Sequence, residues 1–260
     1  MLGRSRATAA GLVAAGACCL SALGAQAASA EEAPQFYTKA PVGGAAPSEI
    51  KETYSIGVTY LEGHASKAKI ECAKGSGSAV VDGPKSVKEV RIKLVECEVP
   101  HVLIRPNGCE NRGTNTKEIE TNNLVGELGL ITSTKDGLRL TAESGAYLME
   151  FECLGGAIML KVKGALLGEI TGAETAGNTI AEAKFRASGD LKFAQSGGIQ
   201  KWTKFLGEST GQQLENVVTE GGKEHEELVG QSMSILVKPV PPDQIGCLLY
   251  TSDAADDLTR

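Results

Sequence analysis

The residues of this chain that could carry out chemistry are a serine in a nucleophile-like motif, three histidines and seven cysteines. Gly207-Glu208-Ser209-Thr210-Gly211 has the Gly-x-Ser-x-Gly pattern, in which hydrolases expose a serine on a strand-to-helix turn. His225 is the only histidine after Ser209, and it follows too closely for the usual order, in which a distant acid precedes the histidine. Because the order of residues does not fit, a secreted hydrolase using Ser209 is the alternative hypothesis and not the preferred one.

The histidines do not have the spacing of a metal site. His64, His101 and His225 are far apart in the sequence, and none forms a short-range pair of ligands. The acidic residues that flank His225 are typical of a solvated, charged loop before the last strand. We therefore predict no catalytic residue, no metal and no cofactor.

The first thirty residues have the three regions of a secretory signal peptide. Arg4 and Arg6 precede an apolar run over 9–23, and small residues at Ala27 and Ala30 suit a signal peptidase. The run is shorter than the roughly 20 apolar residues of a membrane-spanning helix. We predict a signal peptide over 1–30, cleaved near Ala27 or Ala30, no other transmembrane segment, and a secreted or cell-surface protein.

The other end of the chain resembles a translated laboratory sequence. The ten residues 247–256 (CLLYTSDAAD) are similar to one reading frame of a transposase adapter used to prepare DNA sequencing libraries. This resemblance implies that 247–260 is a non-native tail and that Cys247 is not an evolved cysteine. A genuine polar tail is the alternative.

Four cysteines are left between these two ends, and an even count in an exported protein indicates disulfides. Cys72 and Cys153 share the apolar parity of their own strands, whereas Cys97 and Cys109 flank a Pro-containing segment. We predict the bridges Cys72–Cys153 and Cys97–Cys109, although four cysteines allow three connectivities. A four-cysteine zinc site is a rival interpretation, but no Cys-x-x-Cys pair supports it.

Alternation of apolar and polar residues with a period of two recurs along the chain and predicts strands. A phase slip at Val95 indicates a bulge. The alternating apolar positions are Tyr54, Ile56, Val58 and Tyr60; Ala68, Ile70 and Cys72; Val90, Ile92 and Leu94; Tyr147, Met149, Phe151 and Cys153; Ile158, Leu160 and Val162; and Met233, Ile235 and Val237.

Turn sequences separate these strands, and short strands with such punctuation indicate an antiparallel all-β fold. The best helix candidate, 211–220, contains Val217, Val218 and Thr219 and is equally compatible with a strand. The predicted turns are Gly75-Ser76-Gly77-Ser78, Asp82-Gly83-Pro84, Pro106-Asn107-Gly108, Lys135-Asp136-Gly137, Gly155-Gly156, Gly177-Asn178, Ser196-Gly197-Gly198 and Gly221-Gly222.

These patterns predict one all-β domain over 53–238, an antiparallel β-sandwich or barrel-like fold with disulfides. A flexible lead-in over 31–52 precedes it, and a Pro-rich linker or tail over 239–246 follows it. The net charge of −6 removes the electrostatic reason to expect nucleic acid as a partner, and an aromatic content of 4% offers few stacking platforms.

Several short segments resemble a group of uncharacterised exported four-cysteine proteins of actinobacteria. The segments are Asp82-Gly83-Pro84-Lys85-Ser86-Val87, the Cys97 and Cys109 pair, Glu118-Ile119-Glu120-Thr121, 124–129 (LVGELG), Phe151-Glu152-Cys153-Leu154-Gly155-Gly156, Val162-Lys163-Gly164 and Gly168-Glu169-Ile170-Thr171. The resemblance spans about 53–238 and implies an exported β-rich domain with no assigned activity.

The absence of a convergent set of polar residues favours a non-enzymatic structural or binding module, in possible contact with the cell envelope. A carrier of a small apolar ligand is a further alternative, besides the hydrolase. The sequence does not identify the partner.

Overall fold

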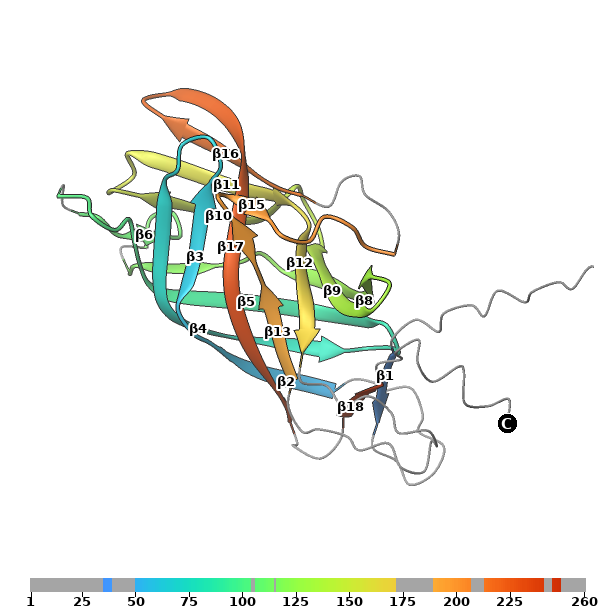
Figure 1. Ribbon diagram of the computed structural model, residues 1–260. Coiled ribbons are helices and arrows are strands. Elements are labelled where there is room, and N and C mark those ends of the chain that lie inside the picture. The colour runs from blue at the N-terminus through green and yellow to red at the C-terminus, as the bar shows by residue number, and fades with distance from the viewer. Residues whose placement is uncertain are drawn as a thin grey trace, which may run out of the picture. The chain divides into compact units, whose positions relative to one another are not determined.

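The computed structural model describes residues 35–38, 50–103, 106–114, 116–171, 189–206, 213–240 and 245–248 (Figure 1). The predicted signal peptide, the Gly177-Asn178 turn and the Ser209 motif lie outside these residues, as does most of the predicted tail. All regular elements described are strands, and all of their pairings are antiparallel, which confirms the predicted all-β domain.

The strands are β1 (Gln35–Thr38), β2 (Ile50–Ile56), β3 (Thr59–Gly63), β4 (Lys69–Val81), β5 (Ser86–Glu98), β6 (Cys109–Glu110), β7 (Glu118–Glu120), β8 (Leu124–Thr132), β9 (Lys135–Ala142), β10 (Tyr147–Cys153), β11 (Ile158–Gly164), β12 (Leu166–Thr171), β13 (Gly189–Phe193), β14 (Gln195–Ser196), β15 (Ile199–Gln200), β16 (Leu214–Glu220), β17 (Lys223–Val240) and β18 (Ile245–Leu248).

Eight strands close into a ring, which corresponds to the barrel-like form of the prediction. Their order is β2-β4-β5-β8-β9-β12-β13-β17, and β17 pairs again with β2. The closure depends on residues 235–237 of β17, which pair with β2 on one side and with β13 on the other. Buried side chains from facing strands, such as Val81, Leu124, Leu140 and Ile235, fill its interior.

The three longest strands, β4, β5 and β17, continue beyond this ring into a second group of strands. There, β17 pairs with β3 and β16, and the sheet continues through β11 and β10 to β6. Figure 1 shows β17 as one long strand that takes part in both groups. Their side chains form one continuous apolar core.

The two groups meet at a crease that crosses three neighbouring strands. The buried residues change from even-numbered to odd-numbered positions between Ile56 and Thr59. The same change occurs on β5 between Leu94 and Cys97. The register is the same on both sides of these positions, because Ile56 lies opposite Gly75, and Thr59 lies opposite Cys72. All three strands therefore change phase together at the same level.

This crease corrects two predictions. The single strand expected over 53–60 is β2 and β3, with Val58 half exposed between them and Tyr60 off the buried face. The phase slip at Val95 is real, but the β4–β5 register is unbroken there. The register shift of β5 lies instead near Glu89, where the backbone has a φ of 51°.

Two predicted turns lie inside strands. Gly75-Ser76-Gly77-Ser78 belongs to β4, where a Cβ at Gly75 would come within 2.6 Å of the Lys93 carbonyl oxygen. Glycine is therefore used here for close backbone approach and not for a turn. The chain reverses at 133–134, so Asp136 and Gly137 lie in β9 and are buried.

Other boundaries also differ from the sequence-based assignment. The helix candidate is strand β16, as its β-branched residues allowed. β17 runs to Val240, past the expected last strand residue Lys238. β1, in the predicted lead-in, pairs with β18, which contains Cys247 of the predicted tail.

The segment 201–206 covers the outer face of β8, β9 and β12 with a second, small apolar cluster. Phe205 is fully buried there against Ile131 and Leu167, with Trp202 packed beside it. The guanidinium of Arg139 lies 4.7 Å from the centre of the Phe205 ring. This cation–π contact and the apolar packing hold the segment on the sheet.

Candidate functional site: a loop clamped between two disulfides

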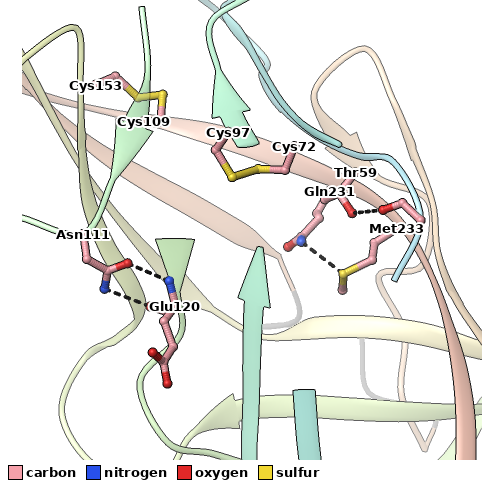
Figure 2. Close-up of a disulfide and its surroundings, with 10 residues drawn as sticks. Thr59, Cys72, Cys97, Cys109, Asn111, Glu120, Cys153, Gln231 and Met233 are labelled. Atoms are coloured by element: carbon pink, nitrogen blue, oxygen red, sulfur yellow. Dashed lines mark hydrogen bonds between the residues drawn. A yellow bond between two sulfur atoms is a disulfide. The ribbon is translucent and has the colours of Figure 1, made fainter. Parts of the chain in front are cut away.

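The cysteines are paired differently from the prediction. The bridges are Cys72–Cys97 and Cys109–Cys153, with Cα–Cα distances of 4.0 and 4.1 Å (Figure 2). All four cysteines are buried, and for Cys72 and Cys153 this is the inward direction that their parity indicated. The predicted bridge between Cys72 and Cys153 is wrong because β4 and β10 are not neighbours, whereas Cys72 lies directly opposite Cys97 in the β4–β5 register.

The two bridges hold both ends of the loop that connects β5 to β6. We call the residues 99–107 the clamped loop, because Cys97 lies two positions before it and Cys109 lies two positions after it. At its base, Val99 N donates to the Asn107 carbonyl oxygen at 2.9 Å, and Glu98 pairs with Gly108. The loop is therefore fixed covalently and by backbone hydrogen bonds where it leaves the sheet.

Leu103 is the most exposed large apolar side chain of the described residues, with 97% of its surface accessible. It lies in the clamped loop, of which positions 104 and 105 are outside the described residues. Val102 is half-buried, and His101 is exposed with a φ of 63°. The Leu103 side chain therefore lies outside the core, and its apolar surface is open to contact by another molecule.

Polar side chains support the base of the loop. The register places glutamates directly opposite each other beside each disulfide, Glu71 with Glu98 and Glu110 with Glu152. Like charges in such positions are destabilising unless donors compensate them. The donors come from 107–117: Asn107 Nδ2 and Lys117 Nζ donate to Glu98, Lys117 N donates to Glu110, and Gly113 N donates to Glu152.

Asn111 holds the end of the same segment against β7. Its Oδ1 accepts from Glu120 N at 2.6 Å, and its Nδ2 donates to the Glu120 carbonyl oxygen at 3.3 Å (Figure 2). The side-chain amide thus imitates a strand partner where β6 ends. The amides of Asn107 and Asn111 fix the chain after the loop tip.

The histidines do not come together. His64 and His101 are exposed in different turns, and His225 is exposed on β17 opposite Val218. His64 Nδ1 lies 2.8 Å from the Gly197 carbonyl oxygen. In the part of the chain that the structure describes, no three His, Cys, Asp or Glu side chains are grouped to hold a metal ion.

The acidic residues around His225 lie in a strand and not in the predicted loop. Glu226 forms an ion pair with Lys163 at 2.8 Å, and Glu215 adds a second one at 3.4 Å. The hydrogen bond that Lys163 Nζ donates to Glu226, and then the one that it donates to Glu215, raise the pKa of Lys163. These are exposed cross-strand pairs of a solvated sheet face, and each contributes little stability.

An exposed ion pair also crosses the crease. Lys74 Nζ lies 2.8 Å from Glu96 Oε1, and its hydrogen bond and charge lower the pKa of the Glu96 carboxyl. At pH values above the ordinary pKa of a glutamate, the pair therefore stabilises the folded state. This contribution is lost as the pH falls through the lowered pKa of Glu96. Both side chains are mostly exposed, so solvent screens the pair.

Glu227 of β17 is a buried carboxylate, and it anchors the turn between β3 and β4. Its Oε2 accepts from Ala65 N at 3.0 Å and from Ser66 N at 2.9 Å, and its Oε1 accepts from Ser66 Oγ at 2.8 Å. All of these contacts lie within the fold. Glu227 is therefore a structural residue, which the charge pattern of the sequence did not reveal.

We expect Glu227→Ala to lower the free energy of unfolding by about 1–3 kcal/mol, because two backbone amides of the turn lose their acceptor. Glu227→Gln should cost less than half as much, since its carbonyl oxygen can accept from both amides and Ser66 Oγ can accept from its amide. Guanidinium unfolding curves of the two variants measure this difference. Equal losses would contradict the acceptor role.

The interior of the ring is filled by side chains at the positions where a ligand would have to lie. A Cβ at Gly168 would lie 2.6 Å from Leu191 Cδ1 and 2.7 Å from Phe193 Cε1. A Cβ at Gly126 would lie 2.4 Å from Val87 Cγ2. Large side chains from other strands occupy the space next to Gly126 and Gly168. Glycine is therefore needed at these two positions on the inner face.

Comparison with known proteins gives no relative: no family model, no curated protein and no solved structure matches the chain. Among the described residues, no helix is long and apolar enough to span a membrane. Two disulfides are compatible with an extracellular location.

Sequence reasoning missed the clamped loop as a candidate site. The available signal was the apolar stretch between Pro100 and Pro106, itself enclosed by Cys97 and Cys109. That pattern was interpreted only as a loop closed by its own disulfide. The exposure of Leu103 is a property of the folded chain.

Proposed function

We propose that this chain is an exported, non-enzymatic binding module that contacts its partner through the clamped loop. The observation that carries the proposal is the 97% exposure of Leu103 in a loop whose two ends are fixed by buried disulfides. Export is supported by the N-terminal signal pattern and is compatible with the disulfides.

The physical basis is preorganisation. A loop whose two ends are already fixed has less conformational entropy to lose on binding, so more of the contact energy appears as affinity. Burying one leucine side chain in a partner contributes about 1.5–3 kcal/mol. Leu103 on its fixed base would therefore contribute to a protein contact through the burial of its apolar surface.

The partner that fits this loop is a protein with a concave apolar pocket on the outside of the cell. A protruding apolar side chain is buried most fully in such a pocket. The acidic net charge of −6 disfavours an anionic membrane surface and nucleic acid. The proposed partner is thus a protein whose apolar pocket receives the Leu103 side chain.

A photoreactive amino acid at position 103, expressed in the cells that export the protein, tests this proposal. We expect irradiation to give one cross-linked species of defined mass, which excess unlabelled protein abolishes. The matched control is the same amino acid at Ser144, an exposed residue of the turn between β9 and β10. An absence of adducts, or equal adducts at both positions, would overturn the proposal.

The hydrolase alternative has its own test, because Ser209 lies outside the described residues. We expect no labelling of the secreted protein by a fluorophosphonate probe. Labelling that disappears in Ser209→Ala would show that the protein is a serine hydrolase and would overturn the proposed binding module. The position of the labelled peptide would show whether the serine of the Gly-x-Ser-x-Gly motif reacts.

A further inference from the structure

Among the described residues, two buried side-chain amides, those of Asn216 and Gln231, have an oxygen without a hydrogen-bond partner, and the amide of Gln231 on β17 lines a cavity. The side chain is 2% exposed, and its Nε2 makes only a weak contact, 3.7 Å from Met233 Sδ. Its Oε1 has no hydrogen-bond partner among the described residues. Figure 2 shows the amide nitrogen turned toward Met233 and the oxygen turned away from it.

Exchanging the positions of the oxygen and the nitrogen does not remove the problem. One polar atom of the amide would still face the core without a partner. A buried amide group that lacks a hydrogen bond costs roughly 1–3 kcal/mol, so native proteins supply a partner or an internal water. The missing partner of Gln231 must therefore be found in the space around it.

That space consists of two small adjoining cavities. Each has a volume of about 10 Å³, and Gln231, Leu94, Ile119 and Met149 line both of them. A cavity of roughly 10–15 Å³ holds one water molecule. Neither cavity has room for an apolar ligand, which would need a volume many times larger.

Each cavity also contains a threonine hydroxyl. Thr121 lines the first, where its Oγ1 accepts from Ile92 N at 3.0 Å, so that its own proton is available to a further acceptor. Thr59 lines the second, where its Oγ1 lies 3.3 Å from the Gly57 carbonyl oxygen. Both hydroxyls are buried. Gln231 and a threonine therefore provide polar atoms on two sides of a water-sized space.

We propose that this pair of cavities is an internal hydration site, in which Gln231 Oε1 accepts a hydrogen bond from a bound water that a threonine hydroxyl also contacts. In the cavity lined by Thr59, whose hydroxyl donates to the Gly57 carbonyl oxygen, Thr59 Oγ1 accepts the second hydrogen of the water. In the cavity lined by Thr121, whose Oγ1 already accepts from Ile92 N, the Thr121 hydroxyl donates to the water oxygen. The site lies near the crease, and Gln231 belongs to the segment of β17 that pairs with β3, directly opposite Leu61. This part of the interior binds water and carries no small apolar ligand.

Magnetic relaxation dispersion of water oxygen in solutions of the whole secreted protein tests the site, because it counts waters that stay buried for longer than the protein tumbles. We expect the count to fall by at least one in Gln231→Met, which keeps the shape of the side chain and removes the amide. The matched control is Met149→Leu, which changes an apolar residue lining both cavities and should keep the count.

A crystal structure of the unsubstituted protein at a resolution that shows waters keeps the proposal testable if Gln231→Met does not fold. We expect electron density for a water within hydrogen-bond distance of Gln231 Oε1 and of a threonine Oγ1. Empty cavities, an organic ligand in them, or an unchanged water count in Gln231→Met would overturn the proposal.

Discussion

Replacing Cys109 and Cys153 together by alanine should lower the free energy of unfolding by about 4 kcal/mol, from the loop entropy that their bridge removes from the unfolded chain. The bridge closes a sequence separation of 44 residues. The double variant of Cys72 and Cys97, with a separation of 25 residues, should lose about 3.5 kcal/mol. Guanidinium unfolding curves without reductant measure both losses.

A mixed double variant is the control for this prediction. Replacing Cys72 and Cys153 breaks both bridges and leaves Cys97 and Cys109 without their partners. It should therefore be less stable than either matched variant. If the mixed variant were instead the more stable one, the pairing expected from the sequence would be correct and the structural pairing wrong.

We expect Gly164→Ala to have the second large effect, a loss of about 3 kcal/mol or more. Gly164 ends β11 with a φ of 99°, which an alanine adopts only at a cost of about 1–3 kcal/mol. In addition, a Cβ at this position would lie 2.0 Å from the Gln213 carbonyl oxygen, so the backbone of the neighbouring strand β16 would have to move. Overpacking of this kind adds roughly 1–3 kcal/mol.

Gly145→Ala is the matched control, because it has the backbone conformation without the contact. Its φ is 80°, and no atom lies within 4 Å of a Cβ built there. We expect it to lose only the conformational part of the free energy of unfolding, measured in the same denaturation experiment. Equal losses in both variants would show that the approach of Gln213 to Gly164 is not tight.

The sequence predicted the strands well where neighbouring residues alone decide the pattern. Phe151, Leu160 and Met233 are buried on the predicted parity, because a strand with one wet face alternates independently of its neighbours. The crease could not be predicted in this way. It exists because β2–β3, β4 and β5 change phase at one level, and that level depends on the register between the strands, which alternation within one strand does not give.

The cysteine pairing failed for the same reason. The inward direction of Cys72 and Cys153 was correct, since it follows from local alternation. Which cysteine lies opposite which depends on the order of strands in the sheet, and periodicity carries no information about that order. A hairpin between β4 and β5, joined by the correctly predicted Asp82-Gly83-Pro84 turn, would have placed Cys72 near Cys97, and the register shift near Glu89 brings the two directly opposite each other.

Buried polar residues were the other features that composition and alternation did not reveal. Glu227 and Gln231 are buried on the same parity of β17 as Met233 and Ile235, whereas the sequence indicates a solvated, charged loop around Glu227. Glu227 is satisfied by the turn between β3 and β4, whereas the Gln231 oxygen lacks a protein partner. Only the folded chain distinguishes an anchor from a hydration site.

The two disulfides clamp the loop 99–107, and a non-reducing tryptic peptide map shows which cysteines are joined. Trypsin does not cleave before Pro106, so Cys97 and Cys109 stay in one peptide, 94–112. We therefore expect one species of three peptides, in which 94–112 is joined to both 70–74 and 140–161.

Further cleavage after Glu98 should then divide this species into a Cys72–Cys97 part and a Cys109–Cys153 part. A peptide 94–112 with an internal bridge, together with 70–74 joined to 140–161, would contradict the clamp and restore the pairing expected from the sequence.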